Sequence, residues 1–149
     1  MNANAAQYSS DSVAHTERIG EELARGLKSG ECVCLIGELG AGKTSFVRGM
    51  ARTLAPGTKV KSPSFTLLNV YEDGSIPFYH IDLYRLAGAV ELEAAGLEDY
   101  IYGKGVCVIE WADRAAGLIP SCSVVVRFSH AGQGRRLLIV ERRGADERV

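Results

Sequence analysis

Hydrophobic residues recur along this chain first at helical spacing and then in short continuous runs, a pattern typical of mixed α/β proteins. Residues 16–27 carry apolar side chains at helical spacing, which predicts an amphipathic helix. Residues 31–36 read E-C-V-C-L-I, and this mostly apolar run predicts a buried strand. Residues 45–54 return to helical spacing, so the first part of the chain is predicted to run helix, strand, helix.

Strands dominate the predicted second half. Residues 66–71 and 76–83 predict two strands joined by E-D-G-S, in which Asp-Gly is a hairpin signal. Further strands are predicted at 105–110, 123–128 and 136–141, a helix at 89–100 and a single helical turn at 112–116. The order of elements predicts an α/β fold whose central sheet is mixed, mostly parallel in the middle and flanked by antiparallel strands.

Length and composition indicate one globular domain over residues 1–149, with 1–10 and 145–149 as flexible ends. Hydrophobic residues make up 46% and charged residues 23%, which is ordinary for a soluble protein. The formal net charge of −1 argues against a surface that binds nucleic acid throughout. No apolar run approaches the ~18 residues of a membrane span, and no signal peptide is visible, so we expect a cytoplasmic protein without a membrane partner.

The motif G-E-L-G-A-G-K-T at residues 37–44 fits G-x-x-x-x-G-K-[ST], the phosphate-binding P-loop. It lies between a predicted strand and a predicted helix, which is the context that the motif requires. The glycines allow backbone N–H groups to close on phosphate oxygens, and the following helix N-terminus favours negative charge. This indicates a P-loop NTPase fold, with the phosphate site at the carboxyl ends of the central strands.

Each position of the motif has an expected role. Lys43 is predicted to reach the β- and γ-phosphates as a catalytic residue, and the Thr44 hydroxyl is predicted to bind Mg²⁺. The nucleotide-binding residues expected from the loop and the start of its helix are Gly37, Glu38, Leu39, Gly40, Ala41, Gly42, Lys43, Thr44 and Ser45.

A P-loop also needs an acidic residue that holds magnesium, usually at the carboxyl end of an apolar strand. Glu110 ends V-C-V-I-E, and Asp82 lies near the end of F-Y-H-I-D-L. From these patterns alone both carboxylates remain candidates. His80 and Asp82 lie two residues apart on a predicted strand and therefore share a face, so both could point at the nucleotide. Trp111 follows Glu110 and is expected beside the site.

Several other segments carry weaker signals. S-P-S-F-T at residues 62–66 could be a switch loop that senses the γ-phosphate, although an ordinary turn explains it equally well. Arg48 and Arg52 lie one turn apart and are expected to form a solvated helix face. Arg85 could stabilise phosphate charge or form a structural ion pair, and Arg135 could lie over the nucleotide.

The four cysteines lie mostly within predicted strands and lack the spacing of a zinc site. We therefore expect buried, reduced thiols that pack as small hydrophobic side chains rather than a disulfide framework. They are Cys32, Cys34, Cys107 and Cys122.

Four motifs follow one another in a specific order: G-E-L-G-A-G-K-T, K-S-P-S-F-T, H-I-D-L-Y-R and I-E-W. Together they closely resemble the TsaE family, also called YjeE, the small bacterial ATPase of tRNA threonylcarbamoyladenosine formation. The resemblance runs from the first predicted helix to about residue 144. One departure is Ser64, where the family usually has threonine, and the hydroxyl is kept.

The resemblance implies roles that the residues alone leave open. It implies that Thr44 and Glu110 hold magnesium and that Asp82 is a catalytic or water-mediated magnesium residue. It also implies that adenine lies near residues 11–16, that residues 62–66 form the switch-like loop, and that Arg135 contacts the nucleotide. The implied ligands are ATP and Mg²⁺.

The family resemblance further implies partners. These are TsaD, which transfers the threonylcarbamoyl group to adenosine 37 of tRNA, and its scaffold TsaB. ATP hydrolysis would then cycle the TsaB–TsaD complex, and tRNA would be reached through that complex.

Three other functions compete with this interpretation. A small P-loop kinase would need an acceptor pocket and usually an arginine-rich lid, and residues 87–100 contain no arginine. A GTPase would carry N-K-x-D and D-x-x-G, and neither string occurs in the chain. A nucleotide-sensing module without catalysis is compatible with the same residues.

Overall fold

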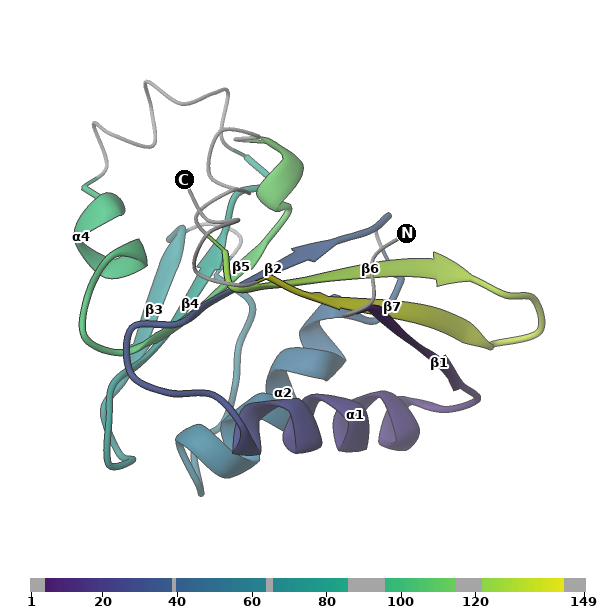
Figure 1. Cartoon of the computed structure of the whole chain (residues 1–149), viewed down its shortest axis with the longest axis horizontal. Helices are drawn as coiled ribbons and strands as arrows, with labels where there is room; N and C mark the ends of the chain where they lie inside the picture. The colour runs from purple at the N-terminus through teal and green to yellow at the C-terminus, as the bar shows by residue number, and fades with distance from the viewer. Residues whose placement is uncertain (1–4, 39, 64–65, 86–95, 115–121, 144–149) are drawn as a thin grey trace.

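The computed structural model describes residues 5–38, 40–63, 66–85, 96–114 and 122–143 (Figure 1). Within these residues, one seven-stranded sheet has the strand order β1-β7-β6-β2-β5-β4-β3. The strands are β1 (Ala5–Ser10), β2 (Cys32–Ile36), β3 (Leu68–Tyr71), β4 (Phe78–Asp82), β5 (Val106–Glu110), β6 (Val124–His130) and β7 (Arg136–Arg142). The helices are α1 (Val13–Arg25), α2 (Lys43–Leu54) and α4 (Glu98–Ile101).

The centre of the sheet is parallel and its edges are antiparallel. Strand β2 pairs in parallel with both β5 and β6, and β4 pairs in parallel with β5. Strands β7, β1 and β3 complete the sheet through antiparallel pairs. Because β2 and β5 are covered on both faces, they form continuous apolar runs rather than alternating ones. The predicted P-loop fold with a mixed, mostly parallel sheet is confirmed.

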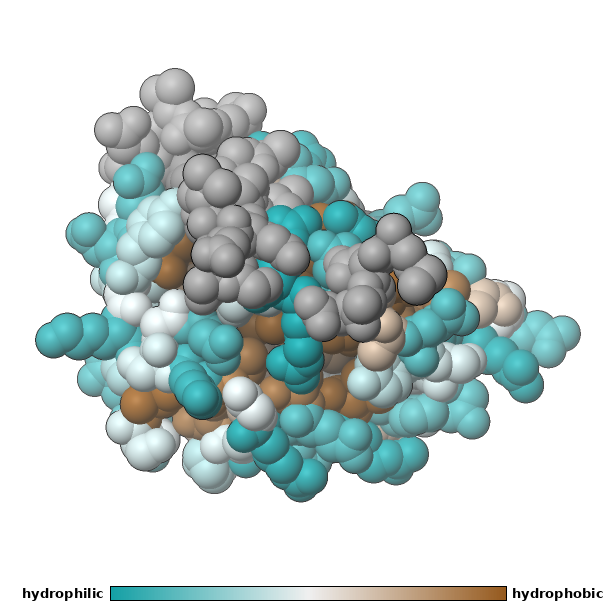
Figure 2. All heavy atoms as spheres, viewed as in Figure 1, coloured by the Kyte–Doolittle hydropathy of each residue, from teal (hydrophilic) through white to brown (hydrophobic). Residues whose placement is uncertain are grey.

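Two apolar clusters pack against opposite faces of the sheet. One joins α1 and α2 to alternate strand residues such as Val33 and Leu35, and the other joins α4 to Cys34 and Ile109. Figure 1 shows α1 and α2 together on one side of the sheet, with α4 on the other. On the face that Figure 2 shows, most side chains are hydrophilic, and hydrophobic ones are visible in a band between them. No helix in the described part of the chain combines the length and apolar character needed to cross a membrane.

Helices α1 and α2 approach each other closely through two glycines. A Cβ atom at Gly49 would lie 1.8 Å from the Glu17 carbonyl oxygen, and one at Gly20 would lie 2.2 Å from the Phe46 carbonyl oxygen. Arg52 also crosses to Glu17, with 2.8 Å between its Nη2 and the carboxylate Oε1. The arginine face predicted for α2 is thus half-exposed but is also paired with α1.

Residues 5–10 form a strand, which differs from the expectation of a flexible N-terminal segment. This strand, β1, pairs with β7 in a register that runs from Ala5 opposite Glu141 to Ser10 opposite Arg136. Its residues are mostly exposed, so backbone pairing holds the strand and the polar sequence gives no hydrophobic signal. Residues 1–4 and 145–149 lie outside the described residues.

The predicted helices differ from the observed ones in their limits. Helix α1 begins at Val13, three residues earlier than predicted, because the Ser12 hydroxyl caps it by accepting a hydrogen bond from the His15 N–H. Of the helix predicted at 89–100, the structure describes residues 96–100, and α4 begins there at Glu98. The hairpin of β3 and β4 forms as predicted.

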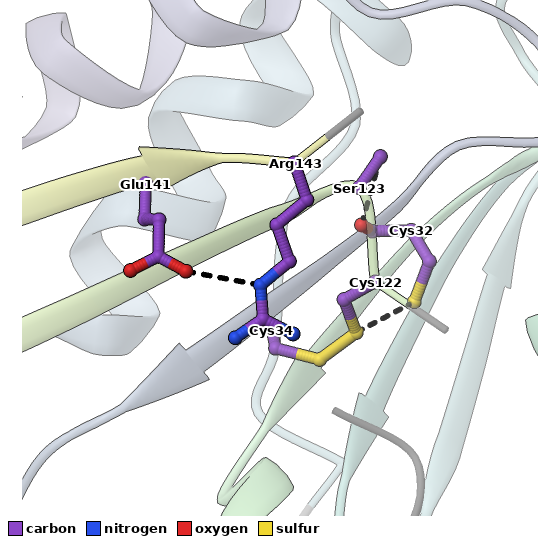
Figure 3. Close-up of a disulfide and its surroundings, with 6 residues drawn as sticks. All are labelled: Cys32, Cys34, Cys122, Ser123, Glu141 and Arg143. Atoms are coloured by element: carbon purple, nitrogen blue, oxygen red, sulfur yellow. Dashed lines mark hydrogen bonds and ion pairs between the residues drawn. A yellow bond between two sulfur atoms is a disulfide. The ribbon is translucent and has the colours of Figure 1, made fainter. Parts of the chain in front are cut away.

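The expectation of four reduced thiols is also corrected. Cys34 and Cys122 form a disulfide, with Cα atoms 6.0 Å apart, while Cys32 and Cys107 are free and buried (Figure 3). The two bonded residues are separated by 88 positions in the sequence. Parallel pairing of β2 with β6 brings them together, and no rule based on sequence spacing could reveal that contact.

Candidate active site

The carboxyl ends of three parallel strands meet at one edge of the sheet. Strand β2 leads into the glycine loop at Gly37, β4 ends at Asp82 and β5 ends at Glu110. Asp82 and Glu110 are direct partners in the β4–β5 register, so the two acidic residues lie side by side. Both residues are buried, with relative exposures of 3% for Asp82 and 2% for Glu110. Buried carboxylates in adjacent strands at such an edge are typical of a ligand site in an α/β fold.

The glycine loop adopts a conformation that only glycine accepts without strain. Gly40 has φ 78° and Gly42 has φ 103°, and Gly42 is the N-cap of α2. A Cβ at Gly37 would lie 2.9 Å from the Cβ of Phe128, so this glycine allows the loop to pass close to β6. The start of α2 therefore points its free N–H groups toward the loop, which favours an anion. Leu39 lies outside the described residues.

Lys43 begins α2 and folds back over the loop. Its ammonium group donates hydrogen bonds to the carbonyl oxygens of Gly37 and Glu38. It also lies 3.6 Å from the centre of the Trp111 ring, within cation–π distance. Burial lowers the pKa of the Lys43 ammonium, and the nearby carboxylates, led by Glu110, oppose that shift.

Thr44, Glu110 and His80 form a continuous chain of polar contacts. The Thr44 hydroxyl donates to Glu110, at 3.2 Å from Oε1 and 3.3 Å from Oε2. The Nε2 atom of His80 lies 2.5 Å from the same Oε2. His80 is fully buried, so it lies behind Glu110 and does not line the cavity described below.

Asp82 connects the site to the segment that follows α2. Its Oδ2 accepts a hydrogen bond from the Ser62 hydroxyl at 3.2 Å, and its Oδ1 accepts one from the Tyr84 N–H at 2.9 Å. Of the predicted switch loop, Ser62, Pro63 and Thr66 are described, while residues 64–65 lie outside the described residues. The contact from Ser62 brings the first residue of this segment to the acidic pair.

A cavity of about 500 Å³ opens above these residues. Its lining includes the loop and helix residues Gly40, Gly42, Lys43, Thr44 and Ser45, together with both acidic residues and Trp111. Ser12, Val13 and Thr16 line it from the N-terminal side, in the segment where the family resemblance implies adenine. Ala41 is buried below the loop, and Glu38 lines a neighbouring cavity.

A known family model matches residues 10–138 of the sequence, a range that includes all of the site residues described above. The model is that of "Threonylcarbamoyl adenosine biosynthesis protein TsaE". The chain belongs to the TsaE family. The resemblance inferred from the four ordered motifs is thereby confirmed.

Curated relatives support the same family. The tRNA threonylcarbamoyladenosine biosynthesis protein TsaE of Treponema pallidum (strain Nichols) is 41% identical over 131 residues, which cover 88% of this chain and 96% of that protein. The protein of the same name from Bacillus subtilis (strain 168) is 38% identical over 133 residues, covering 89% and 75%. The crystal structure of Bacillus subtilis YdiB matches with a TM-score of 0.81 and 31% identity, over 96% of this chain and 88% of that one.

The structure of this TsaE family member also brings in residues that sequence reasoning missed. Arg136, and not the predicted Arg135, lines the cavity, and its guanidinium donates to the Gly40 carbonyl at 3.1 Å. The pattern R-R gives no signal that would separate the two arginines. Arg85 also lines the cavity, which its predicted role in stabilising phosphate charge requires.

Trp111 is held in an unusual backbone conformation beside the site. Its φ is 58°, in the left-handed region, and its ring lies 4.9 Å from that of Tyr84. The Arg114 guanidinium lies over both rings, at 5.8 Å and 5.3 Å from their centres. Side chains other than glycine occupy this backbone region at a cost of about 1–2 kcal/mol, and such strain is concentrated at functional sites. The expectation of Trp111 as a neighbour of the site is confirmed.

Proposed function

We propose that this TsaE family member is the ATPase required for threonylcarbamoyladenosine modification of tRNA adenosine 37, and that it acts in the cytoplasm. The observation that carries the proposal is the contact between the Thr44 hydroxyl and the Glu110 carboxylate, made directly beside Lys43 and Asp82 at the end of the parallel strands. A loop hydroxyl and a strand-end carboxylate are the pair that P-loop NTPases use around magnesium. The family match supports the pathway.

The donor set fits a magnesium ion. Thr44 and Glu110 offer a hydroxyl and carboxylate oxygens, which are the hard ligands that Mg²⁺ prefers. These two residues would hold the ion, and its charge would neutralise charge that develops on the phosphates. His80 fixes the Glu110 carboxylate from behind, so the ligand is oriented before nucleotide binds.

The cavity fits a nucleotide. Its volume of about 500 Å³ lies within the ~300–1,000 Å³ usual for small-molecule sites. The glycine loop and the N-terminus of α2 would bind phosphate oxygens through backbone N–H groups, while Lys43 would supply positive charge. Ser12, Val13 and Thr16 would border the base, and Arg136 adds a cation at the mouth of the loop. Arg135 stays a proposed nucleotide contact on the family resemblance alone, since it does not line the cavity.

Asp82 is assigned to the chemical step. It is the second buried carboxylate of the pair, and hydrogen bonds from Ser62 and the Tyr84 backbone fix both of its oxygens. A carboxylate held in this way can orient the attacking water or a water bound to magnesium. The link to Ser62 gives the segment at 62–66 a direct route for sensing the state of the γ-phosphate.

Hydrolysis would serve a partner complex rather than transfer the threonylcarbamoyl group itself. We propose TsaD and TsaB as the partners, with tRNA reached through them. ATP turnover would reset the assembly between cycles. If nucleotide and partners bind to coupled states of one chain, each must change the affinity of the other by the same factor.

The test is to measure affinity for the purified TsaB–TsaD pair with a non-hydrolysable ATP analogue, with ADP and without nucleotide. The proposal predicts differences of roughly 5- to 150-fold between these states, which corresponds to the usual ~1–3 kcal/mol of coupling. Ser62→Ala is the matched probe, because it removes the hydroxyl that contacts Asp82 and should reduce the differences. Equal affinities in all three states would reject a cycling role and favour a stand-alone kinase or ATPase.

A further inference from the structure

Three sulfur atoms meet on the face of the sheet opposite α1 and α2. Cys32 and Cys34 lie two residues apart on β2 and therefore share a face, and Cys122 reaches them from the segment just before β6 (Figure 3). The three Sγ atoms all lie within 4.8 Å of one another. Each of these residues is at most 2% exposed. A cluster of this kind brings together residues from distant parts of the sequence.

The spacing of the sulfurs suits a shared ion. A thiolate–metal bond of about 2.3 Å allows two sulfurs on one ion to be at most ~4.6 Å apart, and the Sγ atoms of Cys32 and Cys122 already lie within that range, at 3.4 Å. The sulfurs of Cys34 and Cys122 are bonded to each other and must separate on reduction before they can share an ion. Thiolates are soft ligands that select Cu⁺, Zn²⁺ and related ions over Mg²⁺ or Ca²⁺. We propose that Cys32, Cys34 and Cys122, in their reduced form, are a binding site for a thiophilic metal ion.

The Cys34–Cys122 disulfide is the closed form of this site. A dithiol reductant opens it: two electrons and two protons convert the S–S bond to two thiols, while the reductant becomes a disulfide. Each thiol that then binds the ion releases its proton. Cys32 already lies in place, with its Sγ 3.4 Å from that of Cys122.

Cys107 is not part of the proposed ligand set. It is the direct partner of Cys32 in the β2–β5 register, but its sulfur is not one of the three that gather within 4.8 Å. Its thiol is free and buried. Three sulfurs without a fourth favour Cu⁺, since Zn²⁺ is almost always four-coordinate in structural sites.

The experiment uses the full 149-residue chain in two states, oxidised and reduced with a phosphine under anaerobic conditions. Each state is titrated separately with Cu⁺ and with Zn²⁺ against a competing chelator, and bound metal is counted by elemental analysis after gel filtration. We expect one ion per reduced chain, tighter binding of Cu⁺ than of Zn²⁺, and no binding to the oxidised chain. A reduced wild-type chain that binds neither ion would overturn the proposal without any need for a variant.

Variants locate the ion. Cys34→Ala and Cys122→Ala should each lower the affinity by more than the ~10- to 100-fold that loss of a residue behind a ligand causes. Cys107→Ala is the matched control, because it removes a buried thiol on the same face that is not a proposed ligand, so its loss of affinity should stay within that ~10- to 100-fold. Unchanged affinity in the first two variants, or a loss in Cys107→Ala as large as theirs, would contradict the assignment. Circular dichroism of each reduced variant establishes that it is folded, and alanine is chosen because it adds no buried hydroxyl.

Discussion

The imidazole of His80 and the carboxylate of Glu110 share a buried hydrogen bond, with 2.5 Å between Nε2 and Oε2. The two side chains are 0% and 3% exposed, so a water molecule cannot take the place of either hydrogen-bond partner. Because the same carboxylate accepts from Thr44, His80 fixes a residue that we assign to magnesium. The histidine acts as a positioning residue and does not itself reach the cavity.

His80→Phe keeps the volume of the ring but removes the partner of Glu110. We expect the free energy of unfolding to fall by about 1–3 kcal/mol, since a buried carboxylate loses its hydrogen bond. Magnesium-dependent ATP affinity should fall roughly 10- to 100-fold. His80→Gln can restore a donor and should recover part of the loss. Calorimetry with and without Mg²⁺ tests this, and an unchanged magnesium dependence in His80→Phe would remove the positioning role.

Glu110→Gln should impair ATP binding more in magnesium than in EDTA. The amide lacks the negative charge that a hard cation prefers, while the backbone contacts of the glycine loop stay in place. Titrations of wild type and variant in the two buffers measure the difference. Equal losses in both would mean that Glu110 is not a magnesium ligand.

Asp82→Asn should slow hydrolysis more than it weakens nucleotide binding, because Asp82 is assigned to the chemical step. The substitution keeps the shape of the side chain and its contact with the Tyr84 N–H, so folding should be little affected. Single-turnover hydrolysis and equilibrium binding give the two quantities. Loss of affinity with normal turnover of bound ATP would give Asp82 a binding role instead.

Gly49→Ala tests the contact between α1 and α2. Alanine is favoured over glycine in a helix by about 1 kcal/mol, but its Cβ would lie 1.8 Å from the backbone oxygen of Glu17. The clash should dominate and lower the free energy of unfolding by about 1–3 kcal/mol. Gly26→Ala is the control, since its Cβ would meet no atom closer than 3.8 Å. Urea unfolding of both variants decides the matter, and a Gly49→Ala chain as stable as wild type would refute the tight contact.

The parts of the fold and site that the sequence predicted have strong local signals. The glycine loop can be recognised by residue types at fixed spacing, and apolar periodicity predicts the strand before it and the helix after it. Glu110 and Asp82 could be proposed because each ends an apolar run, and parallel strands bring such ends to one edge.

The parts that the sequence could not predict depend on contacts between distant residues. Strand β1 is held by backbone pairing with β7, and its exposed polar side chains carry no pattern. The Cys34–Cys122 bond depends on how β2 and β6 lie beside each other. His80 could be placed on the same strand face as Asp82, but only the structure shows that it points at Glu110.

We propose that the site at Lys43, Thr44 and Glu110 hydrolyses Mg-ATP under the control of the partner complex. The most direct measurement is the rate of ATP hydrolysis by the purified chain alone and with the TsaB–TsaD pair, with Lys43→Ala as the inactive-site variant and Lys28→Ala as a control on an exposed lysine. We predict slow hydrolysis by the chain alone and a clear increase with the pair. Lys43→Ala should lose both the basal and the stimulated hydrolysis, because a charge-assisted phosphate contact contributes about 1.5–3 kcal/mol. Lys28→Ala should keep both. The same rate with and without the pair, or a Lys43→Ala chain that hydrolyses ATP as fast as wild type, would contradict the account.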